Sequence, residues 1–259
     1  MIIIVLIVQL IFCQFYSKEI SLLDYNFINK PIILFFLSFL IPLTGWLFIK
    51  PLITSYLDLK IENKKLFKFK RNYIFFKNTL ISERKVGYQN LQSDLFIGNK
   101  DAKLGITIVT NPLCKYCKDT HIVITDLLKK YSDKIRINLF FNYNPKNEDE
   151  DLKSENIEKL HLKLVDIYFD KNQELFLEAL GDWFMNKDYD KWFNKYGNTL
   201  NSKEDYINIL KNQHQQNRSN KIQFTPSIFI GEFSYPSIYD KKDILLYFND
   251  LLEDPEILV

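Results

Sequence analysis

Two apolar stretches dominate the first fifty residues of the chain. Residues 31–49 form a run of 19 residues without a charged side chain, and such a run is long enough to cross a bilayer as a helix. Residues 1–16 are also apolar, although two glutamines interrupt them. The pattern predicts a transmembrane helical hairpin over residues 1–50, with helices at about 1–16 and 31–49.

The rest of the chain alternates between strand-like and helix-like patterns. Leu104–Thr110 is an apolar run of strand length, and residues 115–131 carry apolar side chains at helical spacing. A second strand-like run, Ile228–Gly231, follows Pro226, which suits the start of a strand because proline cannot donate a ladder hydrogen bond. Between these halves, residues 151–217 repeat apolar side chains at helical spacing and predict a helical insertion.

The predicted insertion is rich in aromatic side chains. We expect them to pack the insertion onto the sheet rather than to line a surface that binds client proteins, because large aromatic residues are mostly buried. They are Trp183, Phe184, Trp192, Phe193 and Tyr196. The order of strands and helices therefore predicts an α/β domain over residues 94–259.

Residues 51–93 are basic and aromatic, and we interpret them as a membrane-proximal connector. Residues 50–85 contain ten Lys or Arg and three acidic residues, and residues 66–70 alternate like a strand. Basic residues beside a span attract lipid phosphates. Residues 86–259 carry 22 basic and 27 acidic side chains, a net charge of 22 − 27 = −5. This balance favours the lipid bilayer over nucleic acid as a partner.

The segment Cys114-Lys115-Tyr116-Cys117 holds two of the three cysteines of the chain. The first cysteine lies where the predicted strand turns into the predicted helix. The unpaired N–H groups and the dipole of a helix N-terminus favour a sulfur anion and lower the pKa of a thiol. Two intervening residues bring the sulfurs within bonding reach, so the pair can cycle between dithiol and disulfide.

The residues alone leave two other interpretations of this pair open. A structural zinc site needs four ligands, so His121 would have to join the pair, together with His161 or His214. These histidines lack the short spacing of such sites, and we expect no metal. Alternatively, both thiols could be buried in the core without a redox role.

The order of strand, Cys-x-x-Cys, helix, helical insertion and Thr225-Pro226 before a strand resembles the thioredoxin superfamily. Three segments resemble its branch of disulfide-bond oxidases and isomerases, the DsbA/DsbG-like proteins. They are Phe96–Asn99, Asn111–Cys117 and Tyr235–Tyr239. Within this branch, the chain is most similar to the thioredoxin-like C-terminal half of bacterial vitamin K epoxide reductase-thioredoxin fusions. The resemblance covers residues 90–255 well and residues 1–85 loosely, and it implies a thioredoxin-like fold.

The resemblance also implies a role for each motif residue. Cys114 matches the exposed nucleophile that forms mixed disulfides, and Cys117 matches the recessed resolving thiol. Pro226 matches a cis-proline beside the active site, where the backbone of Thr225 can pair with an extended client segment. The expected client-binding residues are Thr225, Pro226, Lys115 and Tyr116.

One departure concerns the strand before the motif. Many proteins of this fold bury a carboxylate in that strand, where it relays the proton of the resolving thiol. Residues 104–113 contain no acidic residue. The proton path to Cys117 is therefore not assigned by the sequence.

These observations predict a membrane-anchored thiol:disulfide oxidoreductase that works in the oxidising direction. Its only redox group is the disulfide between Cys114 and Cys117, and no cofactor is expected in the thioredoxin-like domain. Cys13 alone cannot reproduce the quinone-coupled cysteines of the fusion family. Either a membrane oxidase resembling vitamin K epoxide reductase is the partner, with quinone involved only through it, or this chain is the tail of a longer system. A reductase or isomerase fed by a membrane electron donor, or a non-catalytic binding module, remain the alternatives.

The charge pattern and the resemblance disagree about orientation. Basic residues beside a span usually stay in the cytoplasm, although long domains cross the membrane largely regardless of charge. The loop between the two apolar stretches also carries Lys18 and Lys30. Following the resemblance, we expect a protein of the inner, cytoplasmic membrane whose thioredoxin-like domain faces the periplasm or the cell exterior.

Overall fold

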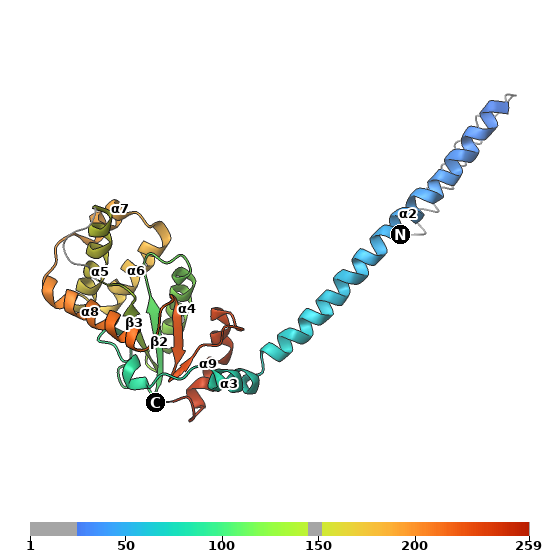
Figure 1. Ribbon diagram of the computed structural model, residues 1–259. Helices are drawn as coiled ribbons and strands as arrows, with labels where there is room; N and C mark the ends of the chain where they lie inside the picture. Colours follow the sequence, from blue (N-terminus) through green and yellow to red (C-terminus); the bar gives the residue numbers. More distant parts are fainter. Residues whose placement is uncertain (1–24, 145–151, 259) are drawn as a thin grey trace. The chain divides into compact units, whose positions relative to one another are not determined.

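The computed structural model describes residues 25–144 and 152–258 (Figure 1). The chain divides into two compact units, Met1–Phe69 and Lys70–Val259. Of the predicted hairpin, the helix over residues 1–16 and Cys13 lie outside the described residues, so only its second helix can be compared with the structure.

Helix α2 (Tyr25–Lys70) is one continuous helix that includes the predicted span. Its segment Ser38–Lys70 is long and apolar enough to cross a membrane by length and composition. Residues 66–70 belong to this helix, so the expectation of a strand-like segment is wrong. The residues before them are rich in Leu, Lys and Glu, which favour propagation of an existing helix, and a short alternation does not overcome that preference.

The second unit is built on a five-stranded mixed sheet with the order β1-β3-β2-β4-β5. Central strand β2 runs parallel to β3 and antiparallel to β4, and β1 and β5 close the two edges in antiparallel pairing. Every residue of β2 is buried, as expected for a continuous apolar strand covered on both faces. The strands are β1 (Phe96–Gly98), β2 (Leu104–Thr110), β3 (Ile135–Phe141), β4 (Ser227–Ile230) and β5 (Phe233–Ser234).

Helices connect and cover this sheet (Figure 1). Helix α4 (Cys117–Tyr131) forms the crossover between the parallel strands β2 and β3, and it begins two residues later than the sequence pattern predicted. Helix α9 (Ile244–Glu253) follows β5, after the short 3-10 helix η2 (Lys241–Asp243). This order of strands and helices is a thioredoxin-like α/β fold.

The predicted helical insertion is confirmed between β3 and β4. From residue 152 onward, where the structure describes it, the insertion contains α5 (Leu152–Asp170), α6 (Gln173–Asn186), α7 (Tyr189–Tyr196) and α8 (Lys203–Ser219). Its aromatic cluster is a packing cluster, because Trp183, Phe184 and Trp192 are all buried. Helix α6 lies close to α4 at Gly181, where a Cβ atom would lie 3.1 Å from the Nε2 atom of His121.

Residues 70–93 belong to the folded domain, so the predicted boundary at residue 94 is wrong. Helix α3 (Tyr73–Ser82) places Phe76 and Leu80 in the core with no exposed surface. The ring of Phe76 stacks on Tyr247 of α9, with centroids 4.1 Å apart. The 3-10 helix η1 (Tyr88–Leu91) follows α3. The basic composition of residues 51–93 drew attention away from α3, although Phe76 and Leu80 lie four residues apart, on one face of a helix.

Candidate redox site

The cysteine pair lies at the carboxyl end of β2, on the loop that leads into α4. The loop is shaped by its own polar groups: the Cys114 N–H donates to the Asn111 carbonyl at 2.9 Å, and the Asn111 side-chain oxygen accepts from the Leu113 N–H at 2.8 Å. Asparagine commonly stabilises turns in this way. The helix then begins at Cys117 itself.

The two thiols differ in depth. Cys114 is partly exposed, whereas Cys117 is 1% exposed and belongs to the hydrophobic core. Both are free thiols in this structure, and their side chains lie within hydrogen-bonding reach of each other. An incoming sulfur therefore has access to Cys114 and none to Cys117.

The surroundings of Cys114 stabilise its thiolate. Burial alone raises the pKa of this thiol, but hydrogen bonds from the side chains of Thr225 and Cys117 and from the backbone N–H groups of Tyr116 and Cys117 outweigh burial. The pKa of Cys114 is lowered as a result. This is the hydrogen-bonding contribution that a helix N-terminus offers an anion.

The surroundings of Cys117 act in the opposite direction. Burial is the largest influence and raises the pKa of Cys117, and the neighbouring Cys114 raises it further. Hydrogen bonds from the Thr110 side chain and the Asn111 backbone offset only part of this. The pair thus contains one thiol that ionises readily and one that holds its proton.

The Thr225-Pro226 segment lies against the reactive cysteine. Strand β4 pairs antiparallel with β2, with Ser227 opposite Val109. Thr225, two residues earlier, therefore falls beside the loop after β2, and its carbonyl oxygen lies 3.3 Å from the Cys114 sulfur. The peptide bond between Thr225 and Pro226 is cis.

The other predicted site residues lie at the surface around Cys114. Lys115 is exposed, and Tyr116 exposes 68% of its surface. The backbone carbonyl of Tyr116 accepts a hydrogen bond from Lys241 at 3.1 Å. Phe224, which sequence reasoning missed, is 79% exposed directly beside Thr225. Its position next to the Thr-Pro motif was the available signal in the sequence.

Sequence reasoning also missed the contacts between the insertion and the redox loop. The indole N–H of Trp183 donates to the Pro112 carbonyl at 2.9 Å. Lys187, which ends α6 in a left-handed conformation, donates to the Leu113 carbonyl at 3.4 Å. Nothing in the local sequence signals these contacts, since about seventy residues separate the partners.

The three histidines considered as zinc ligands lie in separate surroundings. His121 packs on Phe184, His161 stacks on Tyr143 with ring centroids 4.1 Å apart, and His214 lies on α8. Within residues 25–144 and 152–258, no three His, Cys, Asp or Glu side chains are grouped as metal ligands would be.

The sequence of the domain matches that of a known family. The thioredoxin family model matches residues 90–244, and the chain belongs to this family. Comparison with curated protein sequences gives no match.

Solved structures share the fold of the chain. The catalytic domain of ScsC from Proteus mirabilis is 21% identical, with a TM-score of 0.52, and the alignment covers 69% of this chain and 99% of that one. A linker-deletion variant of the same protein is 19% identical, with a TM-score of 0.50, and the alignment covers 79% and 95% of the two chains. At these identities the likeness establishes a common fold.

Proposed function

We propose that this protein is a membrane-anchored thiol:disulfide oxidoreductase that oxidises client proteins. The single observation that supports it best is the opposite displacement of the two thiol pKa values, downward for the accessible Cys114 and upward for the buried Cys117. Neighbouring groups whose surroundings separate their pKa values are typical of reactive sites. Opposite displacements of the two pKa values are not expected for a pair of inert thiols in the core.

The oxidising reaction begins with the Cys114–Cys117 disulfide. A client thiolate attacks the sulfur of Cys114, the bond between the two enzyme sulfurs breaks, and Cys117 leaves as a thiolate that takes up a proton. The client's second thiolate then attacks the client sulfur of the mixed disulfide. Cys114 leaves as a thiolate, the client gains a disulfide, and the enzyme has accepted two electrons as a dithiol.

The low pKa of Cys114 favours this direction. A thiol with a lower pKa is a better leaving group in the second step, and stabilisation of the reduced form makes a disulfide more oxidising. The raised pKa of Cys117 acts against the first step, in which Cys117 is the leaving group, so the preference for oxidation rests on Cys114. We therefore favour oxidation over the reverse reaction, in which a membrane electron donor would feed a reductase or isomerase.

A membrane partner completes the cycle in this proposal. The apolar segment Ser38–Lys70 supports an anchor in the inner membrane, with the domain in the periplasm or outside the cell. The resemblance to vitamin K epoxide reductase-thioredoxin fusions supports a membrane oxidase of that type, which would take two electrons from the dithiol and pass them to quinone. The thioredoxin-like domain itself needs no bound cofactor for this exchange.

Client segments contact the exposed side chains around Cys114 in this proposal. Tyr116, in the motif, and Phe224, next to Thr225, supply exposed apolar surface, and Thr225 offers backbone groups to an extended segment. Lys115 adds positive charge next to the reactive thiolate. An unfolded chain that exposes a cysteine among apolar residues matches this surface.

The direction is tested by equilibrating the full-length protein with glutathione buffers and measuring the fraction of disulfide. We expect a reduction potential well above that of thioredoxin, roughly −270 mV, and rapid oxidation of a reduced peptide that carries two cysteines. A potential at or below the thioredoxin value would assign the protein to the reductase alternative. Failure of the cysteines to form a disulfide in any buffer would leave only the binding module.

A further inference from the structure

The backbone directly before Cys114 is held by helix α6 of the insertion. Trp183 is 1% exposed, and its indole N–H reaches the Pro112 carbonyl at 2.9 Å. Lys187, at the end of the same helix, reaches the carbonyl of the next residue, Leu113. The two residues that precede the reactive cysteine are thus fixed from outside the loop.

This contact matters because the geometry of the loop decides what surrounds the sulfur. The Tyr116 and Cys117 N–H groups stabilise the Cys114 thiolate only while they point at it. Pro112 is buried, and a buried carbonyl that loses its donor is costly, so the chain would turn it toward another partner. Such a turn moves the next residues of the loop with it.

We propose that Trp183 is a positioning residue for the redox loop: through the Pro112 carbonyl it keeps the backbone N–H groups at the start of α4 directed at the Cys114 sulfur. The inference rests on the proposed function, because it takes Cys114 as the reactive thiol. It gives the helical insertion a part in setting thiol reactivity, in addition to covering the sheet.

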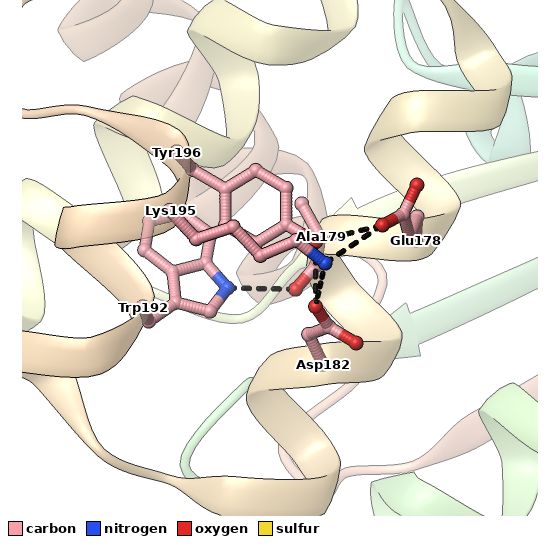
Figure 2. A network of polar contacts seen from close by, with 6 residues as sticks. All are labelled: Glu178, Ala179, Asp182, Trp192, Lys195 and Tyr196. Atoms are coloured by element: carbon pink, nitrogen blue, oxygen red, sulfur yellow. Dashed lines mark hydrogen bonds and ion pairs between the residues drawn. The ribbon is translucent and has the colours of Figure 1, made fainter.

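The chain contains a matched control in the same cluster. Trp192 is 4% exposed and donates its indole N–H to the Ala179 carbonyl at 2.8 Å, as Figure 2 shows. Its ring lies edge-on to that of Trp183, with centroids 6.4 Å apart. The two tryptophans therefore share burial, donor and type of acceptor. They differ in where the acceptor lies, since that of Trp192 is in α6 and that of Trp183 is in the redox loop.

The experiment compares Trp183→Phe with Trp192→Phe in the reduced full-length protein in detergent micelles. The alkylation rate of Cys114 is followed by mass spectrometry across a range of pH, and thermal unfolding is measured in parallel. We expect Trp183→Phe to move the pH midpoint of Cys114 reactivity upward and to slow alkylation below that midpoint roughly two- to tenfold, the effect of losing one hydrogen bond. Trp192→Phe should lower stability to a similar extent and leave the midpoint in place.

Equal pH profiles for the two variants would overturn the proposal. If Trp183→Phe does not fold, replacement of Trp183 by benzothienylalanine, which fills the same volume without an N–H donor, gives the same comparison. Alkylation of the wild-type protein distinguishes failure of the proposed redox function from failure of the positioning role of Trp183. Equal alkylation of Cys114 and Cys117 in the wild type would refute the proposed function, whereas selective alkylation of Cys114 with an unchanged midpoint in the variant would refute only the role of Trp183.

Discussion

Cys114 and Cys117 are separated by only two residues, yet their positions displace their thiol pKa values in opposite directions. Cys114 lies before the first turn of α4, where backbone N–H groups meet its sulfur, and Cys117 lies within that turn and inside the core. Hydrogen bonds to an anion lower a thiol pKa and burial raises it, and each effect dominates at one of the two sites. The direction of attack follows from this difference.

Selective alkylation tests the assignment of the two thiols. In the reduced protein near neutral pH, we expect an alkylating reagent to modify Cys114 well before Cys117. The thiolate is the nucleophile, and Cys114 has the lowered pKa and is the accessible thiol of the pair. Mass spectrometry of digested protein measures the order. Cys117→Ser should accumulate mixed disulfides with clients, and Cys114→Ser should not. Modification of Cys117 first would reverse the assignment.

A buried histidine makes the stability of the domain depend on pH. His161 has no exposed surface, and burial lowers its pKa from 6.5 to about 4. Between these values the unfolded chain binds a proton that the folded chain excludes, so stability falls as pH drops through this window and levels off below it. From pH 7 to pH 5 the loss is about 2 kcal/mol from this residue.

The matched experiment replaces His161 with phenylalanine, which keeps an aromatic ring against Tyr143 and cannot titrate. Chemical denaturation at several pH values should show a flatter dependence of unfolding free energy between pH 7 and pH 5 than in the wild type. His214→Phe is the comparison: burial also lowers the pKa of His214, but this residue is less buried, so we expect a smaller flattening. An unchanged slope in the His161 variant would show that other groups cause the acid destabilisation.

At the scale of elements, α3 and the pair α6–α7 are attached to the domain in different ways. Helix α3 inserts Phe76 into the core against the rings of Tyr239 and Tyr247. Helices α6 and α7 are joined at the surface by Lys195, which bridges Glu178 and Asp182 (Figure 2). Apolar burial contributes far more to stability than exposed ion pairs.

Two single substitutions measure this difference. Phe76→Ala should lower the unfolding free energy of the domain by about 3–5 kcal/mol, because it leaves a cavity in the core. Lys195→Met should lower it far less, because an exposed ion pair contributes little to stability. Denaturant titration of both variants measures the two values. A small loss for Phe76→Ala would indicate that α3 is a connector, as the basic composition of residues 51–93 suggested.

At the scale of the whole molecule, the proposal depends on the side of the membrane that the domain occupies. A reporter fused after Val259 should be active on the non-cytoplasmic side, and the protein should resist extraction with carbonate if Ser38–Lys70, which is long and apolar enough, spans the membrane as proposed. Activity of the reporter only in the cytoplasm would favour the basic residues after the span as the guide to orientation. The domain would then lie in the reducing cytoplasm, where an oxidising function is not expected.

The central elements of the fold could be predicted because their signals are local. Leu104–Thr110 was expected as a strand, and β2 has the same bounds. A continuous apolar run of this length is typical of a buried strand. The insertion was expected at 151–217 and spans α5 to α8, because apolar spacing over several turns is specific for a helix. Local signals misled where they were short, as at residues 66–70, or where an apolar helix lay within a basic stretch of the chain, as α3 does.

The sequence by itself determined that two cysteines stand at a strand-to-helix turn and that a Thr-Pro pair precedes a later strand. Only the tertiary structure decided what surrounds them: the Thr225 carbonyl at the Cys114 sulfur, the depth of Cys117, and the indole of Trp183 at the Pro112 carbonyl. Spacing along the chain encodes periodic burial, because helices and strands repeat with fixed geometry. Contacts between residues seventy or a hundred positions apart depend on how the elements pack, and packing is a property of the whole domain.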